Sequence, residues 1–584
     1  MFKLLKKLNK RDTIYIFICI IFVATQVWLE LKLPDYMSNI TRLVQTEGST
    51  MGEILKQGAY MMACALGSLI TSIIVGYFAA YVAASFSKKM RKEVFTKVEE
   101  FGMEEIKNFS TSSLITRTTN DIMQVQMLIG MGLQVLIKAP IMATWAISKI
   151  AGKSWQWSAI TGGAVGVLFL MVGTIVALVL PRFKIVQKLI DNLNRITREN
   201  LTGIRVIRAY NAEKYQKEKF EKANEELKDM QLFNQRILSI INPVMTTLMS
   251  GITLAIYFSG AYLIAKAQML EKVEIFSNMV VFSSYAIQVV LSFMMLSMMF
   301  IIYPRASVSA QRILEVLETK TRIKDGKLTE GKEKGTVEFR NVSFKYPDAE
   351  EYMLKNISFK ANKGETVAFI GSTGSGKSTL INLVPRFYDT TEGEVLVDGI
   401  NVKEYEQKAL HNKLGYIPQR AVIFGGSINE NISYGDNGKE KPTKEQIEKA
   451  IEVSQGKAFV ESMENKYDTH IAQGGTNISG GQKQRLSIAR AIVRNPEIYI
   501  FDDSFSALDY KTDFQLRKEL KRYTKDATNL IVAQRIGTIK DADQIIVLQD
   551  GEIVGKGKHK DLLQNCEVYK EIAYSQLSQK ELES

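Results

Sequence analysis

The sequence is poor in the residues that build metal centres and disulfide frameworks. Its 584 residues include three cysteines and three histidines. Cys19 and Cys64 lie inside apolar runs and Cys566 lies near the C-terminus, and their spacing matches neither a zinc site nor a disulfide framework. We therefore expect the cysteines to be packing residues. No motif below gives a role to the histidines, which are His411, His470 and His559.

Proline is also scarce, and two long charged segments are almost free of it. Residues 85–128 and 181–238 are rich in Lys, Glu, Leu and Ile at helical spacing, which predicts long helices. Such helical arms invite docking onto another domain. A solvated coiled coil without a partner would show the same pattern, so both interpretations stay open from these segments alone.

Long apolar runs, by contrast, are abundant before residue 305. About 20 predominantly apolar residues are needed for a helix to cross the hydrocarbon core of a bilayer. Six stretches meet this requirement, and they predict six membrane-spanning helices. The stretches are residues 13–33, 57–84, 129–150, 157–180, 240–266 and 276–303.

Basic residues gather on one side of these predicted spans. The loop after the first run carries little positive charge beyond Arg42 and Lys56, whereas the segment after the second run is strongly basic. The positive-inside rule therefore predicts that both termini are cytoplasmic and that the chain is a multi-pass protein of the cell membrane. The net charge of +13 then reflects cytoplasmic segments, and six spans exclude a soluble nucleic-acid-binding protein. The basic residues are Lys88, Lys89, Arg91, Lys92, Lys97, Lys107 and Arg117.

The pattern changes after Tyr303. A charged stretch with three glycines marks a linker, and we set the domains at residues 1–318 for the membrane region, 319–335 for the linker and 336–584 for a soluble domain. Short β-like runs alternate with helical stretches in the soluble part, which predicts a mostly parallel α/β sheet. The runs are Thr336–Phe339, Thr366–Ile370, Glu394–Val397, Ile498–Phe501, Asn529–Val532 and Gln544–Leu548.

A glycine-rich loop with the Walker A pattern follows the apolar strand 367–370 and precedes a helix. Its glycines let backbone N–H groups surround phosphate oxygens, while Lys377 neutralises the β and γ phosphates and the Ser378 hydroxyl can ligate Mg²⁺. The pattern therefore predicts a site for ATP and Mg²⁺. The predicted nucleotide-binding residues here are Gly371, Ser372, Thr373, Gly374, Ser375, Gly376, Lys377, Ser378 and Thr379.

Two further motifs accompany this loop. Residues 498–502 form an apolar strand that ends in Asp502, which is the Walker B arrangement that holds magnesium beside a phosphate-binding loop. Residues 478–485 place Ser479, Gly480 and Gly481 where a helix begins, and such a turn can bind an anion. Alone, a Ser-Gly-Gly turn is more often a plain loop.

Together these residues resemble the ATP-binding cassette (ABC) transporter family. Residues 478–482 match its signature motif, with Ile478 in place of the usual leucine, and the six spans resemble its exporter branch. The resemblance implies a membrane α-helical region with long helical extensions, fused to an α/β P-loop NTPase ABC domain. It also implies that Tyr346 stacks on adenine, that Gln419 contacts Mg²⁺ with Ser378 and Asp502, and that residues 506–509 form the D-loop.

The same resemblance implies two coupling-helix regions, at residues 112–121 and 199–210, whose tips dock on the cassettes in the family. The family pairs its cassettes head to tail, so each ATP lies between the Walker motifs of one chain and the signature of the other. Ser479 and Gly481 are therefore expected to act on a partner's site.

Two residues depart from the family pattern beside the γ-phosphate. The family has a glutamate after the Walker B aspartate, to orient or deprotonate the attacking water, and this chain has Asp503. Its carboxylate would lie more than about 1 Å back from the useful position, and a displacement on this scale can lower the rate roughly 10²-fold. The family's switch histidine is replaced by Gln534, which cannot carry a positive charge. We expect a degenerate site, although both changes would also fit a tolerated variant of a working site.

A homodimer would have two poor sites, yet the signature is intact. This predicts a heterodimer whose second half-transporter supplies the catalytic glutamate and histidine. The chain resembles the degenerate-site subunit of bacterial heterodimeric multidrug exporters. A lipid flippase, an ATP-gated channel and a regulatory nucleotide-binding subunit are the alternatives.

Two features of the predicted spans bear on the substrate. The last span carries a cluster of Met and Phe residues, and flexible thioethers suit a pocket for amphipathic molecules of many shapes, although such residues are more often ordinary packing. Lys138 lies inside an apolar span, where a charge usually faces a cavity or a partner, or else snorkels to the membrane surface. The cluster is Phe293, Met294, Met295, Met298, Met299 and Phe300.

Overall fold

The computed structural model describes residues 1–46, 48–150 and 154–577, which form two compact units. The first unit comprises Met1–Glu99 and Thr111–Thr319. The second comprises Glu100–Ser110 together with the chain from Lys320. The short segment 100–110 therefore groups with the soluble part, although it lies within the membrane region along the sequence.

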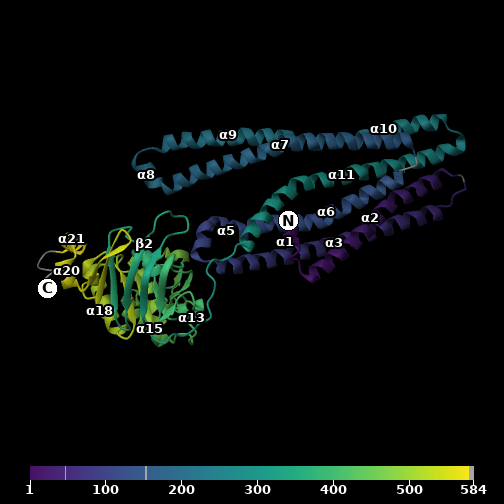
Figure 1. Ribbon diagram of the computed structural model, residues 1–584. Helices are drawn as coiled ribbons and strands as arrows, with labels where there is room; N and C mark the ends of the chain where they lie inside the picture. Colours follow the sequence, from purple (N-terminus) through teal and green to yellow (C-terminus); the bar gives the residue numbers. More distant parts are fainter. Residues whose placement is uncertain (47, 151–153, 578–584) are drawn as a thin grey trace. The chain divides into compact units, whose positions relative to one another are not determined.

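In the part of the chain that the structure describes, the regular elements of the first unit are all helices (Figure 1). Within the described residues, six helical stretches are long and apolar enough to cross a membrane, which confirms the six predicted spans. The long charged segments also continue as helices. The helices are α1 (Phe2–Leu5), α2 (Lys10–Gln45), α3 (Met51–Glu99), α5 (Thr111–Thr118), α6 (Asn120–Ile150), α7 (Trp155–Thr202), α8 (Ile204–Ala209), α9 (Glu213–Ser239), α10 (Ile241–Lys266) and α11 (Met269–Glu318).

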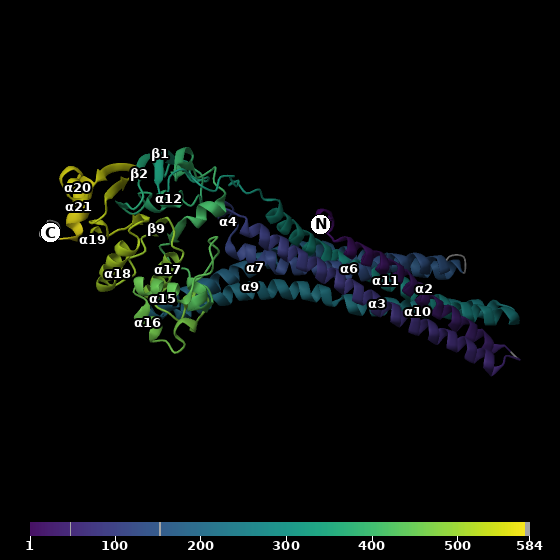
Figure 2. The same cartoon turned by 90° about the horizontal axis from the view of Figure 1, so that it is seen from below.

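These helices pack in pairs along their length. Helix α2 runs beside α3, α6 beside α11, and α7 beside α9 (Figures 1 and 2). Their shared core is apolar and includes Val27, Met142 and Phe282. The fully buried Tyr285 of α11 donates its hydroxyl to the Leu31 carbonyl at 2.8 Å, so α11 is also tied to α2.

The predicted coupling-helix regions form short helices. Helix α5 covers the first region and α8 the second, and both interrupt the long extensions. In the first region the Arg117 guanidinium donates to the Arg312 carbonyl at 2.7 Å and to Glu315 at 2.6 Å, while Asp121 accepts from Ser309 at 2.8 Å. These bonds fix α5 and the start of α6 against α11. The docking role of the two regions stays a prediction.

Within the described residues, the second unit contains two large sheets and a two-stranded antiparallel sheet of β7 and β8. A six-stranded sheet has the order β12-β11-β3-β10-β9-β6, parallel except between β11 and β12, and a four-stranded antiparallel sheet has the order β2-β1-β4-β5. The strands are β1 (Val337–Phe344), β2 (Leu354–Ala361), β3 (Thr366–Gly371), β4 (Glu392–Val397), β5 (Ile400–Asn401), β6 (Leu414–Ile417), β7 (Gly426–Ser427), β8 (His470–Ile471), β9 (Ile498–Asp502), β10 (Thr528–Val532), β11 (Gln544–Gln549) and β12 (Glu552–Gly557).

Helices connect and cover these sheets. The segment 100–110 contributes α4 (Met103–Asn108). The remaining helices are α12 (Lys377–Asn382), α13 (Gln407–Asn412), α14 (Ile428–Ile432), α15 (Lys444–Val453), α16 (Lys457–Glu461), α17 (Gly480–Val493), α18 (Tyr510–Tyr523), α19 (Ile536–Ile539), α20 (His559–Asn565) and α21 (Glu567–Gln576), with short 3-10 turns at Lys466–Asp468 and Gln473–Gly475.

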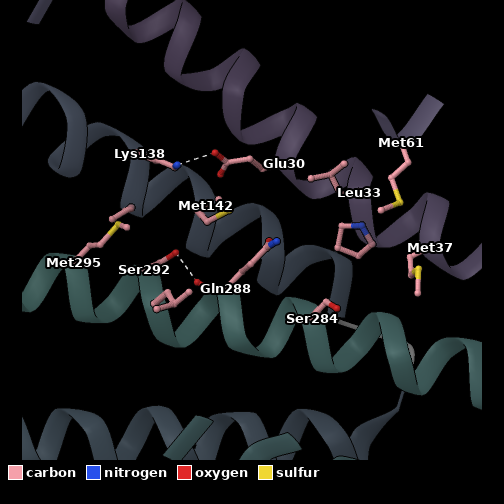
Figure 3. Close-up of a pocket in the computed structure, with 13 residues that line it drawn as sticks. Glu30, Leu33, Met37, Met61, Lys138, Met142, Ser284, Gln288, Ser292 and Met295 are labelled. Atoms are coloured by element: carbon pink, nitrogen blue, oxygen red, sulfur yellow. Dashed lines mark hydrogen bonds and ion pairs between the residues drawn. The ribbon is translucent and has the colours of Figure 1, made fainter. Parts of the chain in front are cut away.

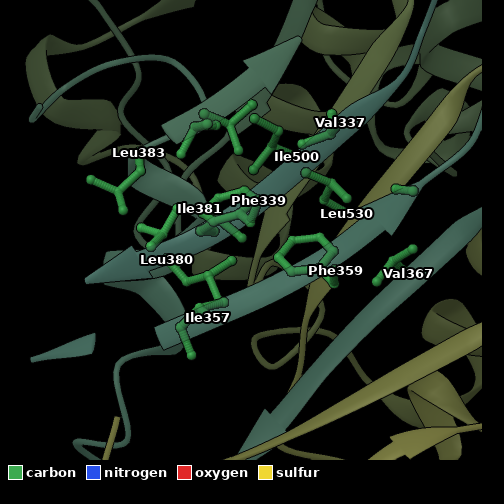
Figure 4. Close-up of a cluster of buried hydrophobic side chains, with 14 of the residues drawn as sticks. Val337, Phe339, Ile357, Phe359, Val367, Leu380, Ile381, Leu383, Ile500 and Leu530 are labelled. Atoms are coloured by element: carbon green, nitrogen blue, oxygen red, sulfur yellow. The ribbon is translucent and has the colours of Figure 1, made fainter. Parts of the chain in front are cut away.

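The expectation of a mostly parallel sheet holds for four of the six predicted strands. The strands β1 and β4 belong instead to the antiparallel sheet. Burial explains the difference, because β3 is buried at Val367–Ile370 without interruption, as strands covered on both faces are, whereas β1 alternates between buried and exposed residues. The two sheets enclose one core with α12, in which Phe339 and Phe359 stack at 4.6 Å (Figure 4).

The predicted linker packs against the second unit. The backbone N–H groups of Gly326 and Lys327 donate to the carbonyls of Tyr405 and Glu404 at 3.0 and 2.9 Å. A Cβ on Gly326 would lie 2.2 Å from the Glu404 carbonyl oxygen, so only glycine allows this close approach. The linker is thus held to the surface of the soluble unit. Its boundaries as a domain division stay a prediction.

Candidate functional site

The glycine-rich loop connects the parallel strand β3 to helix α12. Gly374 and Gly376 have φ of +88° and +95°, a conformation that side chains disfavour. Around Gly374 a Cβ would meet nothing within 4 Å, so the loop leaves open space there for a ligand. This is the geometry that lets backbone N–H groups approach phosphate oxygens.

The ammonium group of Lys377 is buried at the base of this loop. Among the described residues it donates to the carbonyls of Gly371 and Ser372 at 2.9 and 2.7 Å and to the Ser375 hydroxyl at 3.3 Å. Burial lowers the pKa of Lys377, and the nearby carboxylates of Asp502 and Asp503 oppose this shift. A buried cation held by neutral oxygens is well suited to receive an anionic phosphate.

The Walker B aspartate meets the loop directly. Asp502 ends the fully buried strand β9, and the Ser378 hydroxyl donates to its Oδ1 at 2.7 Å. Burial raises the pKa of Asp502, and the Ser378 hydrogen bond opposes that shift. The described residues contain no cluster of three or more His, Cys, Asp or Glu side chains that could hold a metal. A hydroxyl beside one carboxylate nevertheless fits Mg²⁺, which is usually held by one or two carboxylates, phosphates and water.

The two residues that depart from the family pattern, Asp503 and Gln534, are hydrogen-bonded to each other. Asp503 Oδ2 accepts hydrogen bonds from Nε2 of Gln419 at 3.2 Å and from Nε2 of Gln534 at 2.9 Å. Burial raises the pKa of Asp503, and the hydrogen bond from Gln419 and the charge of Lys377 oppose the shift. The Asp503 backbone has φ of +45°, and its N–H donates to the Val532 carbonyl at 3.0 Å. The structure thus brings together Asp503, Gln419 and Gln534.

Tyr346 lies beside the same loop. The hydroxyl oxygens of Tyr346 and Thr379 are 3.0 Å apart. The rings of Tyr346 and Tyr388 pack edge to face, with their centres 5.3 Å apart. The Lys107 ammonium from α4 lies 5.6 Å from the centre of the Tyr346 ring. Neither Lys107 nor Tyr388 was expected here, because no motif marks them in the sequence. Tyr346 is half-buried, and its stacking on adenine stays a prediction.

The signature residues form a separate feature. Ser479 caps α17, because its hydroxyl accepts from the Gln482 N–H at 3.3 Å while its own N–H donates to the Gln482 side chain at 2.8 Å. Ser479 is exposed, and Gly481 is half-buried beside the Ala507 carbonyl. In the described part of the chain, neither residue belongs to the hydrogen-bonded network around Asp502 and Asp503.

Comparison with known proteins decides the family. Residues 354–506 match the family described as ABC transporter, and residues 16–293 match the ABC transporter transmembrane region. An uncharacterized ABC transporter ATP-binding protein of Mycobacterium tuberculosis is 36% identical over 551 residues, which are 93% of each chain. The chain belongs to the ABC transporter family. The resemblance inferred from the sequence motifs is confirmed.

Two other comparisons describe the kind of ABC transporter. The structure of a bacterial Atm1-family ABC exporter with ATP bound superposes with a TM-score of 0.79 at 21% identity, covering 98% of this chain and 99% of that one. The fold is therefore an exporter fold. The ATP-dependent lipid A-core flippase of Pseudomonas aeruginosa is 29% identical over 492 residues, 84% of this chain and 80% of that protein. The chain is thus a multi-pass half-transporter, and its family implies ATP binding and ATP-driven transport.

Proposed function

We propose that this ABC transporter chain is the degenerate-site half of a heterodimeric ATP-driven multidrug exporter. Its own Walker motifs bind ATP and hydrolyse it slowly or not at all. Its signature residues, Ser479 and Gly481, complete the hydrolytic site of a different half-transporter, which supplies the glutamate and histidine that this chain lacks. The substrates are amphipathic small molecules.

The network around Asp503 carries this proposal. A catalytic carboxylate at this position has to reach the attacking water, and aspartate is one methylene shorter than glutamate. Oδ2 of Asp503 also accepts hydrogen bonds from two neutral amides, those of Gln419 and Gln534. Neither amide can take up a proton or carry a positive charge, so the charge that develops on the γ-phosphate would be stabilised less than by a histidine.

Nucleotide binding itself has the residues it needs. Lys377 would turn from the carbonyls of Gly371 and Ser372 to the phosphates, and Tyr346 would stack on the adenine ring. Ser378, Asp502 and Gln419 would hold Mg²⁺, which when bound neutralises phosphate charge. The chain is thus suited to retain ATP even where it hydrolyses it poorly.

The signature turn is suited to serve a partner. Ser479 is exposed at the start of α17, a 14-residue helix whose first N–H groups carry partial positive charge. Since the family pairs its cassettes head to tail, this turn would face the ATP held by the other chain. Asp503 and Gln534 do not take part in that second site.

We propose that both termini and the ATP-binding domain are cytoplasmic. The strongly basic segment after the second span supports this orientation, because positively charged loops are more frequent on the cytoplasmic side of a membrane. We infer a bacterial cell membrane, since the relatives compared above are bacterial proteins.

Native mass spectrometry of the tagged chain, extracted gently from its native membrane, tests the proposal. We expect a companion of different mass whose sequence carries the glutamate and histidine. Two copies of the 65.8 kDa chain alone would refute the heterodimer, and Asp503 and Gln534 would then have to support all hydrolysis.

A lipid flippase is the second candidate, because the Pseudomonas aeruginosa relative bears that function in its name. Substrate-stimulated ATPase activity separates the two candidates. Stimulation by bilayer lipids and not by amphipathic drugs would favour the flippase, and the reverse result would favour the multidrug exporter.

A further inference from the structure

The membrane unit contains a cavity of about 440 Å³ whose walls come from four helices (Figure 3). Helices α2, α3, α6 and α11 of the first unit contribute to it, and it is partly open. One charged pair lies in a wall that is otherwise uncharged and mostly apolar, with Ser284, Gln288 and Ser292 as its neutral polar residues. Its principal lining residues are Glu30, Met37, Met61, Lys138, Gln288 and Met295.

The charged pair joins Glu30 of α2 to Lys138 of α6. The Lys138 ammonium donates to Glu30 Oε1 at 2.8 Å, and the same oxygen accepts from Gln26 at 2.9 Å and from Ser68 at 3.2 Å. The side chains are 22% and 23% exposed, so the pair is largely withdrawn from solvent while it borders the cavity. Of the alternatives left open by the sequence, Lys138 therefore faces both a partner and a cavity, and it does not snorkel to the membrane surface.

The two charges of this pair are satisfied to different degrees. One Glu30 oxygen already accepts three hydrogen bonds. Among the described residues the Lys138 ammonium makes a single one, to Glu30, although an ammonium has three N–H donors. The cavity wall therefore offers spare donors on a cation, and it favours a ligand with acceptor oxygens.

Gln288 of α11 adds a second polar group that the protein leaves unsatisfied. Its side-chain Oε1 is buried and has no hydrogen-bond partner among the described residues. Such a group is costly unless something pairs with it. Figure 3 shows the Gln288 side chain among the lining residues, on a different helix from Lys138. Lys138 and Gln288 line the same cavity, so a polar head group bound between α6 and α11 would lie near both residues.

Methionines make up much of the apolar wall. Met37, Met61, Met142 and Met295 come from four different helices, and their thioethers adapt to irregular apolar shapes. Of the cluster expected in the last span, Met295 lines this cavity, and the side chain of Phe300 lies outside the described residues. An alkyl chain would therefore have a wall that adjusts to it.

A second ion pair provides an internal comparison. Asp35 of α2 accepts from Lys149 of α6 at 2.8 Å, the same length and between the same two helices, but neither residue lines the cavity. Asp35 also accepts from the Tyr285 hydroxyl at 2.7 Å. This pair shows what a purely structural link between α2 and α6 looks like.

We propose that the cavity binds the head group of an anionic amphiphile, with phosphate or carboxylate oxygens on Lys138 and the alkyl part along the methionines. A cationic head group would be repelled by the Lys138 ammonium, and to reach Glu30 it would have to displace the donors that already bind this carboxylate. This inference rests on the proposed export function and narrows its substrate class to acidic amphiphiles.

Binding measurements with chain-matched probes test the proposal. The intact transporter, purified in a neutral detergent with whatever partner accompanies it, is titrated with dodecyl phosphate, dodecanoate and dodecyltrimethylammonium. We expect the anions to bind at least about tenfold more tightly than the cation, since an ion-pair hydrogen bond contributes on this scale. Binding of the phosphate alone would indicate a phospholipid-like head group, and binding of both anions a general acid site. Equal or tighter binding of the cation, or binding of none of the three, would overturn the proposal.

Matched variants separate recognition from structure. Lys138→Gln should weaken dodecyl phosphate binding about tenfold, Lys138→Arg should retain it, and Lys149→Gln should leave it unchanged. Glu30→Gln should strengthen it, because the carboxylate that competes for Lys138 is gone. Equal losses in Lys138→Gln and Lys149→Gln would mean that the Glu30–Lys138 pair is only structural. Should Lys138→Gln fail to fold, Glu30→Gln still decides, because binding should be tighter than in the wild type in this variant and unchanged in Lys149→Gln. These measurements involve neither hydrolysis nor the partner's identity, so their outcome is independent of the heterodimer test.

Discussion

Two carboxylates, one in each unit, collect several hydrogen bonds on a single oxygen, and they do so with different donors. Glu30 accepts from an ammonium and two neutral groups in the membrane unit, whereas Asp503 accepts from two neutral amides in the cassette. Since hydrogen bonds to an ammonium are stronger than those to neutral donors, the Glu30 site is suited to electrostatic recognition. The Asp503 site holds its carboxylate with weaker, uncharged partners.

The comparison also shows where positive charge is available to a ligand. In the cassette Lys377 is the buried cation beside the phosphate loop, and it is bound by neutral carbonyls. In the membrane unit Lys138 is already paired with the carboxylate of Glu30. The cassette cation should therefore contribute more to binding its anion than the membrane cation does.

Replacing Lys377 should give the largest effect. Lys377→Met removes the cation that faces the phosphates and keeps an apolar stem of similar length. We expect ATP affinity to fall by about 10²-fold or more, since charge-assisted hydrogen bonds to two phosphates are lost. Equilibrium binding of a fluorescent ATP analogue measures this. Lys363→Met serves as a control, because Lys363 is an exposed residue outside the Walker motifs. A change of less than about threefold in Lys377→Met would contradict the assigned role.

Restoring the family residues should give the next largest effect. Asp503→Glu combined with Gln534→His should raise ATP turnover by up to about 10²-fold in the assembled complex, because the carboxylate regains its reach and the switch position regains a chargeable ring. Turnover of each single variant and of the double variant is measured by phosphate release. If neither the single nor the double changes alter turnover, the degenerate-site account of these residues is wrong.

The ion pair and the amide pair should differ in stability when one donor is lost. Lys138→Met leaves a largely buried Glu30 carboxylate without its cation, whereas Gln534→Met removes only a neutral donor from Asp503. We expect the melting temperature to fall by several degrees in the first variant and by much less in the second. Adding Glu30→Gln to Lys138→Met should recover most of the loss. Equal shifts in the two single variants would remove the distinction between the sites.

The sequence predicted the cassette site better than the membrane site for a physical reason. The phosphate loop is contiguous, and Asp502 and Val532 lie at paired positions on the adjacent parallel strands β9 and β10, which brings Asp503 and Gln534 together. Glu30 and Lys138 are 108 residues apart and meet only because α2 packs against α6. No local pattern encodes that pairing, so the sequence indicated Lys138 without its partner.

The antiparallel sheet was missed for a related reason. Strand propensity predicts that β1 and β4 exist, but their neighbours depend on long-range pairing. The alternation of apolar and polar residues along β1 carried the missing information, because parallel strands buried on both faces read as continuous apolar runs.

The smallest expected effect concerns the pH dependence of stability at Asp503. Burial raises the pKa of this carboxyl in the folded chain, so the folded state favours the protonated form. The contribution of the group to stability is complete below the unfolded pKa, near about 3.9, and is lost as the pH rises through the folded pKa. Asp503→Asn cannot ionise and should be more stable than the wild type at neutral pH, by about 1 kcal/mol or less.

The melting temperatures of Asp503→Asn and the wild type should therefore converge as the pH falls from about 8 towards about 5, towards the ordinary range of an aspartate. Asp526→Asn is the matched control, since Asp526 is exposed. A gap that widens on acidification would mean that the hydrogen bonds from Gln419 and Gln534 and the charge of Lys377 outweigh burial. The folded chain would then favour the ionised form of Asp503, and the contrast between the neutral partners of Asp503 and the ammonium partner of Glu30 would lose its consequence.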